Sequence, residues 1–119
     1  MYVIVIEEPK IGFKDFIKQL KRQGNSINPK KSLLDNMANA VFSKMFGGSD
    51  EAKIFEYNNI EVDGLKAVIF SVVSKSIFYQ FGLIEGKYTL YQIISWTLTD
   101  NANTFEYRMK KIVQSFKEV

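Results

Sequence analysis

The sequence predicts an α+β domain in which an antiparallel sheet of about five strands carries helices on both faces. Four segments from residue 53 onward have the composition or two-residue apolar period of strands, and short turn signals separate them. Residues 65–73 are apolar at both odd and even positions, which is typical of a central strand covered on each side. Helical patterns before and after this antiparallel meander supply the two covering layers.

The first predicted element is a strand over residues 2–6. Its run of Tyr, Val and Ile favours a strand, and Glu7, Glu8 and Pro9 end it. An uninterrupted apolar run predicts a buried strand, which we expect to join the edge of the meander. Because the strand starts without a preceding turn, we expect that upstream sequence is missing from this chain.

A helix is predicted to begin near Gly12 and to end at Gly24 and Asn25. Its apolar residues recur at i, i+3, i+4 and i+7, so they share one face of a helix. These residues are Phe13, Phe16, Ile17 and Leu20.

A second helix is predicted to start near Pro29 or, alternatively, after Ser32 as its N-cap, and to end at Gly47 and Gly48. Its apolar face is broad, so we expect extensive burial. The residues of that face are Leu34, Met37, Ala38, Val41 and Met45, and Leu33, Phe42 and Phe46 widen it.

The meander is predicted to begin with a strand over residues 53–62, interrupted near Asn58 and Asn59. Asp63 and Gly64 are a strong hairpin signal before the central strand over residues 65–73. Residues 77–83 alternate between apolar and polar or small side chains, and residues 85–87 form the next turn.

The last strand and helix occupy residues 88–116. The even positions of the strand are mostly apolar, so we expect helices to cover them, including Tyr88 and Trp96. The odd position Tyr91 is predicted to be an exposed aromatic that forms a binding surface with Tyr57 or Tyr107. The helix after the turn at residues 100–103 has one apolar face, made of Phe105, Met109, Ile112, Val113 and Phe116.

The composition excludes several chemistries. The chain has no cysteine and no histidine, so disulfides, thiol nucleophiles and histidine bases are absent. Its 16 Lys and Arg are interspersed with 13 Asp and Glu, which favours solvated surfaces over a nucleic-acid partner. No apolar run approaches the roughly 18 residues of a membrane span.

Paired carboxylates are the only ready acid–base groups, and each pair lies at a turn or strand end, where solvated acidic residues are common. The pairs are Glu7 and Glu8, Asp50 and Glu51, and Glu61 and Asp63. We therefore expect no catalytic residues, no metal and no cofactor.

Residues 91–98, followed by a short Asp/Asn linker and a helix ending at Ser115 and Phe116, resemble the PsbP-like family, which includes bacterial DcrB-like proteins. The likeness extends loosely to residues 2–8 and 60–73. It implies an antiparallel sheet between helices and an accessory or binding role without known catalysis. It also implies an extracytoplasmic location, periplasmic or cell-surface, with the cytoplasm as the alternative.

The chain departs from the family at its start, because the usual N-terminal strand pair with its Pro-x-x-Trp-like pattern has no match. That departure leaves an uncovered sheet edge beside residues 2–6, which invites pairing with another chain. We expect interaction through Tyr2, Ile4, Ile6 and Tyr91, with a homodimer formed by sheet extension or segment exchange.

Taken together, these patterns predict a single PsbP-like domain over residues 1–119, truncated at its N-terminus, that acts as a non-catalytic accessory or protein-interaction domain. The alternative is a small-ligand carrier or a simple carboxylate-dependent enzyme. Its pocket would lie between the sheet and a helix, with Tyr88 and Trp96 among the lining residues.

Overall fold

A computed structural model of the chain describes residues 1–25, 27–28, 30–47 and 49–118, with Phe13 described by its backbone alone. The predictions that involve Pro29, Gly48 and the Phe13 side chain lie outside the described residues. The elements, in chain order, are β1 (Tyr2–Pro9), α1 (Phe13–Arg22), α2 (Leu33–Phe46), β2 (Lys53–Val62), β3 (Leu65–Ser74), β4 (Ile77–Glu85), β5 (Thr89–Leu98), the short 3₁₀ helix η1 (Thr99–Asn101) and α3 (Ala102–Gln114). Within the described ranges, no helix has both the length and the apolar character needed to cross a membrane.

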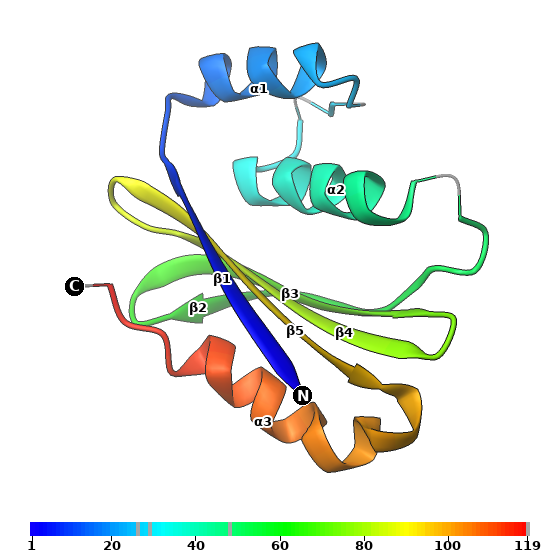
Figure 1. Cartoon of the computed structure of the whole chain (residues 1–119). Coiled ribbons are helices and arrows are strands. Elements are labelled where there is room, and N and C mark those ends of the chain that lie inside the picture. Colours follow the sequence, from blue (N-terminus) through cyan, green and yellow to red (C-terminus); the bar gives the residue numbers. More distant parts are fainter. Residues whose placement is uncertain (26, 29, 48, 119) are drawn as a thin grey trace.

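The strands form one sheet in the order β1-β5-β4-β3-β2, and all neighbouring strands are antiparallel. Helix α2 covers one face of the sheet, α1 lies on the outer side of α2, and α3 covers the opposite face (Figure 1). The predicted α+β class, with a five-stranded antiparallel sheet between helices, is confirmed.

The turn between β2 and β3 has the predicted residues and geometry. Asp63 and Gly64 have φ angles of 51° and 79°, as the two central residues of a type I′ hairpin require. The irregularity in β2 lies between Ile54 and Glu56, however, and the predicted interruption at Asn58 and Asn59 is wrong. Both asparagines keep regular partners on β3, since pairing along that strand tolerates polar residues on its exposed edge.

The larger core lies between α2 and the sheet. The rings of Phe70 and Phe81 stack with centroids 4.7 Å apart, and Phe46 of α2 meets Phe81 edge-on at 6.2 Å. Ser32 is the N-cap of α2, because its hydroxyl accepts a hydrogen bond from the Asp35 amide at 3.1 Å. Met45, predicted to be on the buried face, is exposed because Phe46 takes the core position at this end of the helix.

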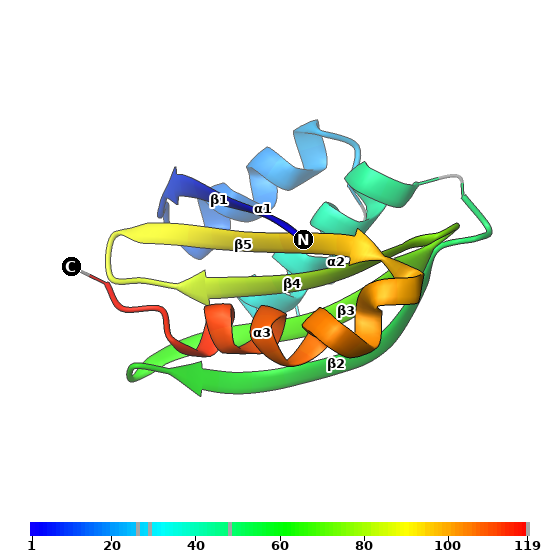
Figure 2. The ribbon, with the colours of Figure 1, turned by 60° about the horizontal axis from the view of Figure 1, so that its bottom comes forward.

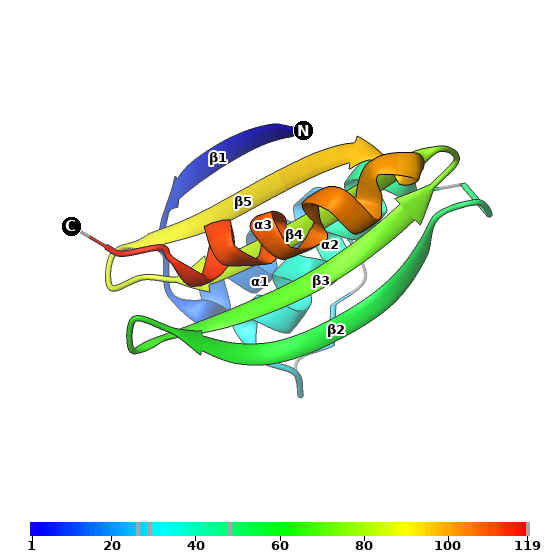
Figure 3. The same ribbon diagram turned by 90° about the horizontal axis from the view of Figure 1, so that it is seen from below.

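The smaller core lies between α3 and the sheet. Met109 and Val113 of α3 are fully buried, as the helical spacing predicts. Figure 3 shows α3 lying over β4, between β3 and β5, and Figure 2 shows it on the face of the sheet opposite α1 and α2. The helix approaches closely at Gly82, where a Cβ atom would lie 2.6 Å from two methyl carbons of Val113.

A row of polar residues crosses the sheet beneath α3. Glu56 pairs with Ser71, Ser71 with Gln80 and Gln80 with Ser95, so the row spans four strands. The last three residues are buried. Among the described residues, Gln80 Oε1 and Ser95 Oγ have no hydrogen-bond partner.

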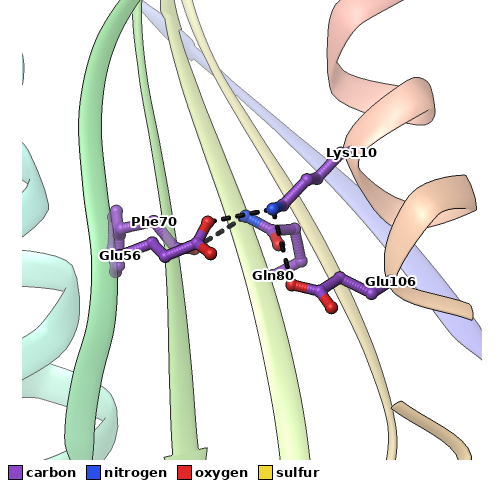
Figure 4. Close-up of polar contacts among 5 residues, drawn as sticks. All are labelled: Glu56, Phe70, Gln80, Glu106 and Lys110. Carbon is purple, nitrogen blue, oxygen red and sulfur yellow. Dashed lines mark hydrogen bonds and ion pairs between the residues drawn. The ribbon is translucent and has the colours of Figure 1, made fainter. Parts of the chain in front are cut away.

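Lys110 of α3 closes the end of this polar row at the edge of the sheet (Figure 4). Its Nζ lies 2.9 Å from Glu56 of β2 and 3.4 Å from Glu106 one helical turn earlier. The hydrogen bond to Glu56 is the largest cause that raises the pKa of Lys110. Gln80 Nε2 donates to the Phe70 carbonyl at 3.1 Å, so the amide is fixed to the neighbouring strand.

Candidate interaction edge

Strand β1 forms one edge of the sheet. It pairs with β5 without interruption, from Tyr2 opposite Trp96 to Pro9 opposite Thr89. No strand of the described residues pairs with its other side. Seen from below the sheet, β1 is the outer rim of the molecule and no helix extends beyond it (Figure 3).

Four consecutive apolar residues of β1 are exposed. The exposed fractions are 68% for Tyr2, 42% for Val3, 45% for Ile4 and 52% for Val5. Alternate residues point to opposite faces of a sheet, so apolar surface is exposed on both faces of β1. The prediction that residues 2–6 form a strand is confirmed, but the prediction of a buried strand is wrong, because α2 and α3 lie over the centre of the sheet.

In β1, the backbone amide and carbonyl groups of alternate residues face β5. The Lys10 amide donates to the Tyr88 carbonyl at 2.9 Å, and bonded and non-bonded pairs alternate in an antiparallel ladder. Because the register has no shift, the backbone groups of the odd residues Val3, Val5 and Glu7 face away from β5. Pro9 also occupies an odd position, where the missing amide hydrogen removes no bond to β5.

The even residues of β1 differ in their contacts. Ile6 is half-buried and packs against the core beneath α2, whereas Ile4 stays exposed. The Tyr2 ring stacks on Trp96 with centroids 5.7 Å apart and an interplanar angle of 22°. Trp96 is half-buried under this stack and packs on the same core. Of the predicted contact residues, Tyr2 and Ile4 are therefore exposed, while Ile6 is packed against the core.

The expectations for two tyrosines are corrected. Tyr88 lies in the turn before β5 and is 74% exposed, because β5 begins at Thr89 and no helix covers the turn. Tyr91, expected to be exposed, is half-buried against Phe116, with ring centroids 4.6 Å apart. Its hydroxyl donates to Glu118 at 2.9 Å, and this hydrogen bond is the main cause of the raised pKa of Tyr91.

A cleft of about 280 Å³ adjoins β1, where α1 and α2 meet the edge of the sheet. Gln92 of β5 lies in the cleft with only 9% of its surface exposed, and its side chain makes no hydrogen bond to the described residues. Trp96 and Tyr88 do not line this cleft. The lining residues are Ile6, Glu8, Phe16, Gln19, Leu20, Gln23, Met37, Ala40, Val41, Lys44, Met45, Gln92 and Ile94.

The opposite edge strand, β2, differs from β1 in regularity. Ile54 and Phe55 are exposed, but the register shift between Ile54 and Glu56 interrupts the edge there. The Tyr57 hydroxyl donates to Asp35 of α2, which ties β2 to that helix. Tyr57 therefore lies on the α2 side, away from Tyr91, and does not form the predicted aromatic surface with it.

The chain is similar in structure to two solved proteins. No family model and no curated protein matches its sequence. PA94 from Pseudomonas aeruginosa, a protein of unknown function with a proposed regulatory role, superposes with a TM-score of 0.60 at 11% identity; the match covers 99% of this chain and 83% of PA94. The cyanobacterial PsbP protein CyanoP from Synechocystis superposes with a TM-score of 0.63 at 12% identity; the match covers 98% of this chain.

The chain has the PsbP-like fold. It spans 66% of CyanoP, slightly less than two thirds of that protein's length. At 11% and 12% identity both likenesses are of fold alone, so they assign no role to any residue of this chain.

Two features of the structure are missed by the sequence patterns. The apolar run that includes Val3 and Val5 predicts a buried strand, although the charged pair Glu7 and Glu8 followed by Pro9 is a signature of edge strands. The sequence does not indicate that Gln92 lines a cleft, because a single glutamine near apolar residues has no distinctive pattern.

Proposed function

We propose that this chain is a non-catalytic protein-interaction domain that binds an extended segment of a partner along the outer edge of β1. The observation that carries the proposal is the exposed apolar run from Tyr2 to Val5 on a strand with outward-facing backbone groups. An added strand gains main-chain hydrogen bonds along such an edge, and its side chains pack on both faces. The regular pairing of β1 makes it a better template than the interrupted edge of β2.

The positions of the acidic residues support a non-catalytic role. General acids and bases are usually tuned by burial or by close charged neighbours. Every residue of the three predicted carboxylate pairs is exposed, and the described residues contain no group of three or more side chains suited to hold a metal ion. These residues are Glu7, Glu8, Asp50, Glu51, Glu61 and Asp63.

The two edge strands allow a matched test. Ile4 of β1 and Ile54 of β2 are the same residue type and both are 45% exposed. The chain and its variants are cross-linked to proteins in an extract of the native source, and the amount of partner recovered is measured. Ile4→Glu should recover at least ten-fold less partner, which corresponds to a loss of about 1.4 kcal/mol in binding free energy. Ile54→Glu should retain the partner. A partner held equally by both variants would contradict the proposal.

A second candidate function is binding of a small ligand in the cleft beside β1. The buried Gln92 amide carries both a donor and an acceptor without partners among the described residues, and apolar side chains such as Ile6 and Ile94 surround it. A ligand with an aliphatic body and a primary amide end fits this chemistry. The cleft is lined by no buried carboxylate, so the arrangement favours a carrier over a carboxylate-dependent enzyme.

The cleft can be tested with hexanamide as the probe. Saturable NMR shifts are expected at Ile6, Gln92 and Ile94, and N,N-dimethylhexanamide should bind more weakly because it donates no hydrogen bond. Gln92→Leu should abolish the difference in affinity between the two probes. Gln114→Leu, at an exposed position of α3, should preserve that difference. Absence of saturable shifts with either probe would exclude this candidate.

We also propose that the chain is an exported relative of the PsbP-like proteins, with the DcrB-like proteins as its bacterial kin, and that residues 1–119 form one domain. The support is the resemblance of residues 91–98 together with the shared fold. Fractionation of cells from the native source should recover the chain outside the cytoplasm; recovery in the cytoplasmic fraction would favour the alternative location.

A further inference from the structure

The apolar run at the start of β1 is complementary to itself. Residues 2–6 read Tyr-Val-Ile-Val-Ile, with two valines placed symmetrically about Ile4. In an antiparallel pair of identical strands centred on Ile4, Val3 faces Val5 of the other copy and Tyr2 faces Ile6. Each of the five apolar residues then meets another apolar residue.

The outward backbone groups suit this alignment. Val3 and Val5 both direct their amide and carbonyl groups away from β5, so the two residues form a hydrogen-bonded pair across the strands. Ile4 faces its own copy in a non-bonded pair, where side chains lie closest. An alignment shifted by one residue would place residues of opposite faces against each other, which the alternation of side chains excludes.

Charge also favours the alignment centred on Ile4. A centre at Val5 would set Tyr2 against Glu8 and Val3 against Glu7 of the other copy. With the centre at Ile4, the two copies of Glu8 lie about 27 Å apart along the strands at about 3.4 Å per residue, well beyond the ~8 Å screening length of physiological salt. In that alignment Glu7 lies opposite Met1 of the other copy, and Glu8 extends beyond the paired residues into solvent.

We propose that the partner at this edge is a second copy of the chain, paired antiparallel through β1 about a two-fold axis at Ile4. This inference rests on the proposed function, since it names the occupant of the same edge. The two sheets become one continuous sheet. Because the axis is perpendicular to this sheet, α1 and α2 of both copies lie on one face and α3 of both copies lies on the other. The contact is short, so the dimer is expected to be reversible and dependent on concentration.

Single cysteines test the alignment, because the chain contains no cysteine of its own. Residues in a non-bonded antiparallel pair have Cα atoms about 4.5 Å apart, within the range of about 4.4–6.8 Å that a disulfide spans. Ile4→Cys should therefore form a disulfide dimer under mild oxidation. Val5→Cys should not, since its two copies are diagonal neighbours about 7–8 Å apart. Ile54→Cys controls for random collisions at the same exposure. Efficient cross-linking at residue 5 or 54 but not at residue 4 would overturn the alignment.

Opposite charges at residue 4 test the dimer without a covalent bond. Ile4→Glu and Ile4→Lys should each stay at the 13.7 kDa mass of one chain in light scattering, because like charges meet at the axis. An equal mixture should regain the doubled mass that the unmodified chain reaches at high concentration. Circular dichroism confirms that each variant is folded.

The outcomes separate the two proposals. An unmodified chain that stays at the single-chain mass at all concentrations, or a mixture that does not associate, overturns self-pairing. If in that case Ile4→Glu still loses a partner that Ile54→Glu keeps, the edge binds another protein and the proposed function stands.

Discussion

Gly82 shows how a single residue sets the distance between a helix and the sheet. A Cβ atom there would lie 2.6 Å from two methyl carbons of Val113, much closer than ordinary contact allows. Val113 is itself fully buried, so its side chain cannot avoid the added methyl group by turning into solvent. The absence of a side chain at residue 82 therefore permits α3 to rest directly on β4.

We expect Gly82→Ala to lower the free energy of unfolding by about 1–3 kcal/mol, the usual range for an overpacked core. Urea denaturation followed by circular dichroism measures the change. Gly12→Ala is the control, because a Cβ atom at residue 12 has no neighbour within 4 Å. The double variant Gly82→Ala with Val113→Ala should recover part of the loss; equal stability of Gly82→Ala and Gly12→Ala would contradict this account.

At the scale of elements, a hydrogen bond from Tyr57 to Asp35 joins the edge strand β2 to α2. Asp35 also accepts a hydrogen bond from the Ser32 hydroxyl at 2.9 Å, so the N-cap of α2 and the link to β2 share one carboxylate. Burial and, next, the hydrogen bond to Asp35 raise the pKa of Tyr57 well above its ordinary value.

This raised pKa predicts a dependence of stability on alkaline pH. The folded state holds the Tyr57 proton more tightly than the unfolded chain, so its contribution is complete below about pH 10 and is lost as the pH rises further. Tyr57→Phe removes the hydrogen bond, so it should lower stability at neutral pH and flatten the alkaline decline. Urea denaturation from neutral pH to about pH 11 measures both effects; an unchanged decline in the variant would show that other groups cause it.

The sequence predicted most elements because their signals are local. The cap at Ser32 and the turn at Asp63 and Gly64 depend on side-chain and backbone chemistry within a few residues. Burial of β1 was predicted wrongly because the same β-branched residues serve in edge and central strands. Tyr88 was misplaced for a related reason, since the period of β5 continues by one residue into the turn.

At the scale of the whole molecule, the candidate site depends on contacts between distant segments. The pairing of β1 with β5 joins residues at least 80 positions apart, from Pro9 and Thr89 to Tyr2 and Trp96, and local patterns carry no information about such a partner. The cleft also arises at this scale, because α1 packs on α2 and leaves Gln92 beside open space. Predicting the class of fold was therefore easier than predicting which surface it leaves open.

The stack of Tyr2 on Trp96 has a practical consequence. Trp96 is the single tryptophan of the chain, and it lies opposite the first residue of β1. Its indole is thus a built-in optical probe of the rim of the sheet. When another strand covers the Tyr2 ring and excludes water from the indole below it, the fluorescence of Trp96 should move to shorter wavelength. A dilution series in a fluorimeter can therefore follow association at this edge without any label.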